Sequence, residues 1–208
     1  MTRIFLASAN AKKILEMQRI LAERVPDVEV LGIGDIEGYV EPVEDQPTFE
    51  GNALLKARAG VAATGLPSIA DDSGLCVDAL NGMPGVLSAR WSGPPKSDER
   101  NNDLLLAQLD DVPDERRGAH FACAVAWVLP DGRERVVEGR MDGRIIREVR
   151  GSGGFGYDVL FVALEHDAEG LTSAELEPGE KDRISHRGRA LRELAPYVAA
   201  DLTGPASG

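Results

Sequence analysis

Two adjacent acids, Asp71 and Asp72, follow a short apolar stretch and lead directly into Ser73 and Gly74. Successive side chains of an extended chain point to opposite sides, so only one of the two carboxylates can face a given pocket. Oxygen donors of this kind suit Mg²⁺, which binds one or two carboxylates together with the phosphate oxygens of a substrate. An Asx-turn, in which the acids accept hydrogen bonds from nearby backbone N–H groups, explains the same residues equally well.

A second carboxylate ligand could come from the loop before Thr48, which contains Glu41, Glu44 and Asp45. An exposed, charged loop is the alternative interpretation of these three residues.

The segment from Ser8 to Lys13 lies where a short apolar strand passes into a helix. A helix start presents free backbone N–H groups and the positive end of the helix dipole, so Asn10 and Lys13 there could hold phosphate oxygens. The alternative is that Asn10 only caps the helix and that the lysines only solvate it.

Two later segments could recognise the rest of a nucleotide. The glycine-dense run from Gly151 to Asp158 lets the backbone approach a ligand closely and offers aromatic rings for stacking on a nucleobase; the alternative is a flexible loop with a core Phe. The run from Lys181 to Arg187 gathers donors before the last helix, although pairing of Lys181 and Arg183 with Glu177 and Glu180 explains those charges too.

Composition and motif content disfavour several function classes. The formal charge of −12 would repel a polyanion, which disfavours nucleic acid as a partner. Only two cysteines occur, and the longest apolar run is far shorter than the roughly 20 residues of a membrane helix, so we expect a soluble, cytoplasmic protein without disulfides. Zinc-ligand spacing, a nucleophile elbow and a P-loop are missing from the sequence, which disfavours zinc and covalent chemistry.

Hydrophobic periodicity predicts the elements that position these residues. We expect strands over 3–8 and 28–33, extended pieces on either side of Asp71 and Asp72, a hairpin of 120–129 with 134–141, and a strand over 160–162. We expect a first helix that carries Ile14, Met17 and Leu21 on one face. Further helices are expected from Thr48 as N-cap to near Gly65, over 98–109, and over 186–200 with Ser185 as N-cap. The order of these elements predicts an α/β fold with a mixed sheet, a single domain over residues 1–200, and a flexible tail over 201–208.

Taken together and in this order, six motifs span nearly the whole chain. They are Leu6 to Lys13, Thr48 to Ala53 with Lys56 and Ala57, Ala70 to Leu75, Pro84-Gly85 with Ser88 to Arg90, Gly153 to Asp158, and Ser185 to Gly188. This set closely resembles the inosine triphosphate pyrophosphatase family, also called Ham1-like.

The resemblance implies an elongated α/β fold, a central sheet flanked by helices, two lobes with a substrate cleft between them, and a homodimer. It implies hydrolysis of non-standard purine nucleoside triphosphates, such as ITP, dITP and XTP, to the monophosphate and pyrophosphate. Asp72 would bind Mg²⁺ and act as the base toward water, Glu44 would be the second metal ligand, and Lys13 would neutralise developing charge. The resemblance further implies that the triphosphate is held by Ser8, Ala9, Asn10, Ala11, Lys12 and Lys13, and that Lys56 and Ser73 contact the substrate. It implies that the base and sugar are surrounded by Phe155, Gly156, Tyr157, Asp158, Lys181, His186 and Arg187.

Three positions depart from the family pattern: Ala9 stands where Gly is usual, Gly51 where Glu is frequent, and Val159 where Pro is common. His186 and Arg187 are the candidates for reading the 6-oxo group that separates inosine and xanthine from adenosine. Two other functions remain open. One is a Maf-like pyrophosphatase for other modified nucleotides, and the other is a non-catalytic module that binds nucleotides.

Overall fold

The computed structural model describes residues 2–203, apart from the side chains of Lys12 and Glu16. Its strands form a six-stranded sheet of order β2-β1-β3-β4-β5-β6. The strands are β1 (Thr2–Leu6), β2 (Val28–Leu31), β3 (Ser68–Val77), β4 (Gly118–Val128), β5 (Glu134–Ile145) and β6 (Phe161–Ala163). The α-helices are α1 (Ala11–Ala22), α2 (Phe49–Thr64), α3 (Asp98–Gln108), α4 (Pro178–Ile184) and α5 (His186–Thr203).

The sheet is mixed, as the order of elements predicts. β1 runs parallel to β2 and to β3, whereas β5 and β6 are antiparallel. A tight turn links β4 to β5: the backbone N–H of Leu129 donates to Arg133 O at 2.9 Å, and that of Gly132 donates to Leu129 O at 3.0 Å. The predicted hairpin is therefore confirmed, with a second strand that runs on to Ile145.

The chain divides into two compact units. Unit 1 comprises Met1–Asp72, Ala124–Glu138 and Arg189–Gly208, and unit 2 comprises Ser73–Cys123 and Gly139–Gly188. Among the described residues, no helix is long and apolar enough to span a membrane.

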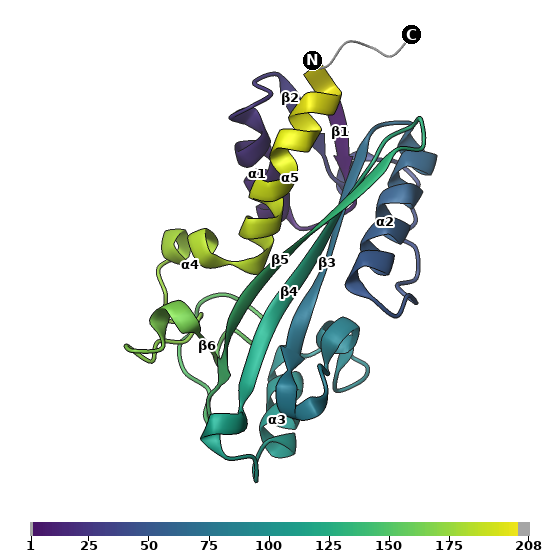
Figure 1. Ribbon diagram of the computed structural model, residues 1–208. Coiled ribbons are helices and arrows are strands. Elements are labelled where there is room, and N and C mark those ends of the chain that lie inside the picture. The colour runs from purple at the N-terminus through teal and green to yellow at the C-terminus, as the bar shows by residue number, and fades with distance from the viewer. Residues whose placement is uncertain (1, 204–208) are drawn as a thin grey trace. The chain divides into compact units, whose positions relative to one another are not determined.

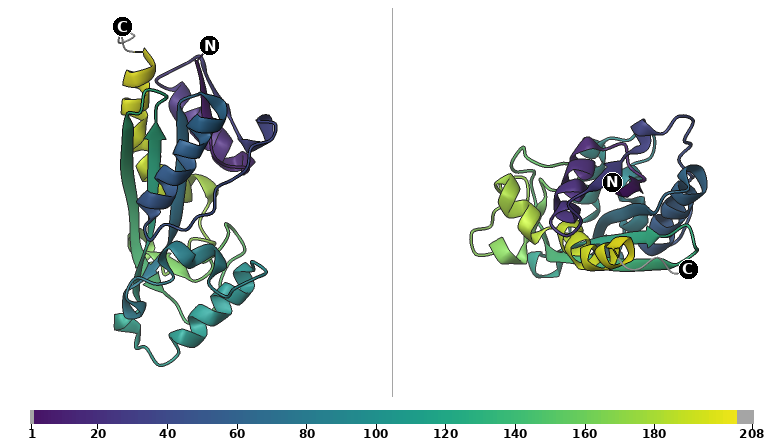
Figure 2. Two further views of the ribbon diagram at one scale, coloured as in Figure 1. Left: turned by 90° about the vertical axis from the view of Figure 1, so that its right-hand side faces the viewer. Right: turned by 90° about the horizontal axis from the view of Figure 1, so that it is seen from above.

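In unit 1, helix α2 lies on one face of the sheet, with α1 and α5 on the other (Figures 1 and 2). The predicted caps of α2 are confirmed: Thr48 Oγ1 accepts a hydrogen bond from Gly51 N at 3.0 Å, and Gly65 ends the helix at φ 66°. Small residues bring α2 close to the sheet, and a Cβ at Gly60 would lie only 2.6 Å from the ring of Phe5. The helix is thus held closely against β1 and against β3, the strand that carries the acids.

In unit 2, the core forms between α3 and the strand segments of that unit. Leu105 and Leu109 are fully buried there together with Met141 and Phe161. Ser97 caps α3 by accepting from Arg100 N at 3.2 Å, as is typical of a helix start. The predicted helix over 98–109 is confirmed and ends one residue earlier, at Gln108.

One expectation about local structure is wrong, and one helix was not expected. Asp71 and Asp72 do not separate two extended pieces, because β3 continues through both of them; its neighbours β1 and β4 provide ladder partners on both sides. Lys181 and Arg183 precede the last helix as expected, but they belong to a separate helix, α4, which the sequence pattern did not predict. Pro178 at the first turn of α4 suits that position, as its missing N–H would have no helical partner.

The last helix begins as predicted. Gly188 N donates to Ser185 Oγ at 3.0 Å, so Ser185 is the N-cap of α5. The helix continues to Thr203, and residues 204–208 of the expected tail lie outside the described residues.

Candidate functional site

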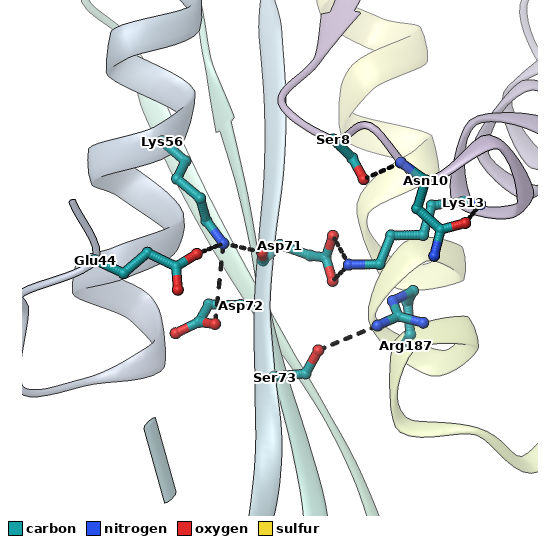
Figure 3. A network of polar contacts seen from close by, with 9 residues as sticks. All are labelled: Ser8, Asn10, Lys13, Glu44, Lys56, Asp71, Asp72, Ser73 and Arg187. Atoms are coloured by element: carbon teal, nitrogen blue, oxygen red, sulfur yellow. Dashed lines mark hydrogen bonds and ion pairs between the residues drawn. The ribbon is translucent and has the colours of Figure 1, made fainter. Parts of the chain in front are cut away.

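The two acids of β3 face opposite sides of the strand, as its pleat requires (Figure 3). Asp71 contacts Lys13 of α1, whereas Asp72 contacts Asn52 of α2. These side-chain contacts account for both carboxylates within a continuous strand, which excludes the Asx-turn interpretation.

Asp72 is largely buried and firmly oriented. Its Oδ2 accepts a hydrogen bond from Asn52 Nδ2 at 2.9 Å, and the amide of Asn52 is itself fixed because Asn52 Oδ1 accepts from Gln46 N at 3.0 Å. Burial raises the pKa of the Asp72 carboxyl above its ordinary value, against the lowering effects of Lys56 and of the Asn52 hydrogen bond. A carboxylate with a raised pKa is a better proton acceptor, so the site suits a general base.

Lys56 links Asp72 to Glu44. Its Nζ donates to Glu44 Oε1 at 2.6 Å and to the backbone oxygen of Asp71 at 2.7 Å, and it lies 3.9 Å from Asp72 Oδ1 (Figure 3). Lys56 is one helical turn after Asn52, so both side chains leave the same face of α2. Of the three acids in the preceding loop, Glu44 is thus the one that shares a cation with Asp72, while Asp45 accepts from Gln46 Nε2 at 2.6 Å.

The donor set at this point fits a hard divalent cation. Glu44 and Asp72 provide carboxylate oxygens directed at a single positive charge. Within the described part of the chain, no group of three or more His, Cys, Asp or Glu residues could hold a metal ion by itself. Mg²⁺ commonly binds through one or two carboxylates and completes its shell with phosphate oxygens and water, so the residues present match that ion when a phosphate ligand is bound with it.

On the other side of β3, Lys13 pairs with Asp71. Lys13 Nζ lies 2.9 and 2.8 Å from the two Asp71 carboxylate oxygens. The start of α1 is ordered by local bonds: Asn10 N donates to Ser8 Oγ at 3.1 Å, and Lys13 N donates to Asn10 Oδ1 at 3.4 Å. Asn10 is therefore a capping residue that also lies at a helix N-terminus beside a lysine, the arrangement expected of a phosphate site.

The remaining residues of this segment differ in what the structure describes. Ala9 and Ala11 are exposed, and the side chain of Lys12 lies outside the described residues. Asn81 is the only described non-glycine residue with a positive φ, so Ala9 occupies the place of the family's glycine without left-handed backbone. Gly51, the second departure from the family pattern, leaves room for Gln46. A Cβ at position 51 would lie only 2.8 Å from Gln46 Cβ and would displace Gln46, whose N–H binds the Asn52 side chain.

In unit 2, two of the predicted base-binding residues, Phe155 and Lys181, contact a third, Asp158. Its Oδ2 accepts hydrogen bonds from Lys181 Nζ at 2.5 Å and from Phe155 N at 2.8 Å. Gly154 has φ +75°, and a Cβ there would collide with Asp158 and Lys181, so this loop position requires glycine. Lys181 therefore pairs with the buried Asp158. This contact replaces the alternative interpretation, in which Lys181 forms a surface ion pair with Glu177 or Glu180.

The two aromatic residues of this loop have different environments. The side chain of Phe155 is 63% exposed, with Lys181 Nζ 5.6 Å from its ring centre, whereas Tyr157 is buried and donates its hydroxyl to Ser88 O at 2.9 Å. Burial also raises the pKa of Tyr157 above its ordinary value. The ring accessible to a flat ligand is that of Phe155.

Both backbone polar groups of Gly156 are hydrogen-bonded. Its N–H donates to Asp98 Oδ2 at 2.7 Å, and its oxygen accepts from Asn102 Nδ2 at 3.1 Å. Both partners lie on α3, one turn apart. Helix α3 thus positions the glycine-rich loop.

Two further predicted residues follow Ser185. Arg187 Nη2 lies 3.2 Å from Ser73 Oγ, the residue directly after the two acids (Figure 3). The ring of His186 stacks on Phe121 with centres 5.0 Å apart and planes at 11°. Each side chain is therefore held by a contact within unit 2.

Sequence reasoning did not assign a site role to Asn52, Asp98 or Asn102. Asn52 and Lys56 are four residues apart on a predicted helix, which is the signal that could have placed them on one face. Asp98 and Asn102 show the same spacing, but nothing local connects α3 to residue 156.

Known proteins resemble this chain along almost its full length. The model of the Ham1 family matches residues 4–197. A dITP/XTP pyrophosphatase of Nocardia farcinica is 59% identical over 201 residues, which covers 96% of each chain. A dITP/XTP pyrophosphatase of Corynebacterium efficiens is 56% identical and covers 97% of this chain and 99% of its own.

Solved structures agree with this likeness. A HAM1 protein from Coxiella burnetii has a TM-score of 0.87 at 38% identity, covering 95% of this chain and 98% of its own. A nucleoside-triphosphatase / dITP/XTP pyrophosphatase from Mycobacterium abscessus has a TM-score of 0.78 at 54% identity, covering 94% and 100% respectively.

Proposed function

Since this chain belongs to the Ham1 family, we propose that it hydrolyses non-standard purine nucleoside triphosphates, such as dITP, ITP and XTP, to the monophosphate and pyrophosphate. The reaction consumes one water and cleaves the anhydride bond between the α- and β-phosphates. It would remove these nucleotides from the pool available for nucleic-acid synthesis.

The observation that carries this proposal is the arrangement around Asp71 and Asp72. Two lysines from two different helices converge on one strand, and each is paired with a carboxylate group. Phosphoryl-transfer sites need positive groups for the phosphates and a carboxylate for the metal or the water, and little else from the protein. Residues 8–13 together with Lys56 are proposed to bind the triphosphate.

Asp72 is proposed to orient water and to accept its proton. The Asn52 hydrogen bond fixes the direction of the carboxylate, and its raised pKa favours proton uptake. Asp72 and Glu44 would hold Mg²⁺, which supplies charge neutralisation on the phosphate oxygens when bound. Lys13 would stabilise the charge that develops on the phosphates as the anhydride bond breaks.

Unit 2 is proposed to recognise the base and the sugar. Phe155 offers an exposed ring for stacking, and Lys181, which is paired with Asp158, lies beside that ring. Ser73, Gly156, Tyr157, Asp158, His186 and Arg187 complete the proposed set. A donor aimed at the 6-oxo position would disfavour ATP, because its 6-amino group would face that donor without an acceptor.

We further propose that the protein is a cytoplasmic homodimer that does not bind nucleic acid. The charge of −12 supports the last point, since a polyanion would be repelled.

The test is pyrophosphate release from ITP, dITP, XTP, GTP and ATP, with Mg²⁺ and with a chelator, by the wild-type protein and by Asp72→Asn. We expect metal-dependent release from the first three substrates. We expect a loss of turnover of about 10²-fold or more in Asp72→Asn, with an unchanged far-UV circular dichroism spectrum.

Near-normal turnover by folded Asp72→Asn would remove Asp72 from the mechanism. Tight nucleotide binding without pyrophosphate release by the wild type would instead identify a non-catalytic nucleotide-binding module.

A further inference from the structure

Glu44 and Asp72 are the two proposed metal ligands, and the ammonium group of Lys56 lies between their carboxylates. It lies 2.6 Å from Glu44 Oε1 and 3.9 Å from Asp72 Oδ1 (Figure 3). Only 9% of Lys56 is exposed, so this charge is held inside the protein rather than in solvent. A buried lysine needs compensating partners, and these carboxylates supply them.

The backbone fixes Lys56 in this position. Its Nζ also donates to the backbone oxygen of Asp71 at 2.7 Å, an acceptor that cannot rotate away as a side chain can. Glu44 and Asp71 repel the charge on Asp72, whereas Lys56 attracts it. The lysine thus stabilises a cluster of acids that would otherwise repel one another.

A free divalent cation entering here must approach a positive charge that is already in place. The ion would repel the ammonium group and would gain less from two carboxylates whose charge is already partly neutralised by Lys56. A triphosphate changes this balance, since its oxygens provide both new ligands for the metal and a new partner for the lysine.

We propose that Lys56 is a placeholder cation for Glu44 and Asp72, so that the nucleotide-free protein binds a divalent cation weakly and acquires it together with the triphosphate. This inference rests on the metal site of the proposed function. It adds an order of binding, in which a metal–nucleotide complex enters rather than the two components separately.

The test measures binding of Mn²⁺ alone, by electron paramagnetic resonance of the free ion, to nucleotide-free protein. The variants are Lys56→Met and Lys56→Gln, with Lys13→Met as the matched control. Lys13→Met removes the same charge, but from a lysine that pairs with Asp71. A general effect of net charge would therefore change the Lys13 and Lys56 variants alike.

We expect both Lys56 variants to bind Mn²⁺ at least about tenfold more tightly than wild type, which corresponds to about 1.4 kcal/mol. Lys13→Met should remain close to wild type, and adding Glu44→Gln to Lys56→Met should abolish the gain. Equal or weaker binding by the folded Lys56 variants would overturn the proposal. Binding of Mn²⁺ with micromolar affinity by the nucleotide-free wild-type protein would also overturn the proposal. This measurement does not depend on the folding of any variant.

The outcome is independent of turnover. A gain in Mn²⁺ affinity in the Lys56 variants, together with no pyrophosphate release by the wild-type protein, would retain the placeholder and reject the proposed reaction. Pyrophosphate release by the wild-type protein, without a gain in Mn²⁺ affinity in the Lys56 variants, would do the reverse.

Discussion

Lys13 Nζ lies 2.9 and 2.8 Å from the two carboxylate oxygens of Asp71, which hold it in a two-point contact. An ammonium group has three N–H donors, so one donor remains for a phosphate while Asp71 keeps the other two. Asp71 is buried, and Lys13 is the more exposed partner of the pair. We infer that Asp71 is a positioning residue for Lys13.

The first prediction concerns this pair. Asp71→Asn should lower kcat/KM for ITP about tenfold or more, mainly through a higher KM, because Lys13 loses its two-point support. A double-mutant cycle with Lys13→Met measures the coupling, and the double variant should be little worse than Lys13→Met alone. Strictly additive losses would show that the two residues act separately.

A second prediction concerns base selection. Arg187→Ala should lower the ratio of kcat/KM for ITP to that for ATP about tenfold, because a donor for the 6-oxo group is lost. The dependence of ITP hydrolysis on Mg²⁺ concentration should be the same in Arg187→Ala as in the wild type. Arg183→Ala, an exposed arginine on α4, is the matched control. An unchanged ITP-to-ATP ratio in Arg187→Ala would remove Arg187 from base recognition.

The third prediction concerns the stability of unit 2. The buried guanidinium of Arg117 donates to three backbone oxygens, those of Leu109 at 2.6 Å, Ile145 at 2.9 Å and Ile146 at 3.0 Å. Arg117→Met would leave these acceptors without that donor and should lower the free energy of unfolding by about 3 kcal/mol or more. Urea denaturation measures the change.

The neighbouring Arg116 is exposed, so Arg116→Met should change the free energy of unfolding by no more than about 0.5 kcal/mol. Similar losses in the two variants would contradict the role of Arg117.

The fourth prediction is a pH dependence. Burial lowers the pKa of His120, and Arg140 lowers it further, while Asp142 and Asp78 act in the opposite direction. The unfolded chain therefore takes up a proton near pH 6.5, before the folded protein does, and the free energy of unfolding should fall as the pH drops below about 6.5.

His120→Gln should remove that part of the decline. Urea denaturation at pH 7.5 and at pH 5.5 compares the two proteins, and a series between pH 7.5 and pH 9 provides the baseline, where their profiles should run parallel. An equal decline in wild type and variant below pH 6.5 would assign the acid sensitivity to other groups.

The sequence by itself determined most of the elements and the alternation of the acids. Helix caps such as Thr48 and Ser185 act within a few residues, and the pleat of a strand places Asp71 and Asp72 on opposite sides whatever else is nearby. The mixed α/β sheet followed from the order of these local signals. These features could be predicted because their causes are local.

Only the tertiary structure decided which partners the acids meet. Lys13 and Asp71 are 58 residues apart, and Asn52 and Asp72 are 20 apart, so their contacts depend on which helix covers which face of β3. The continuity of β3 and the burial of Tyr157 likewise depend on neighbours distant in sequence. Local patterns fix which way a side chain points, but strand order and helix packing fix what it meets.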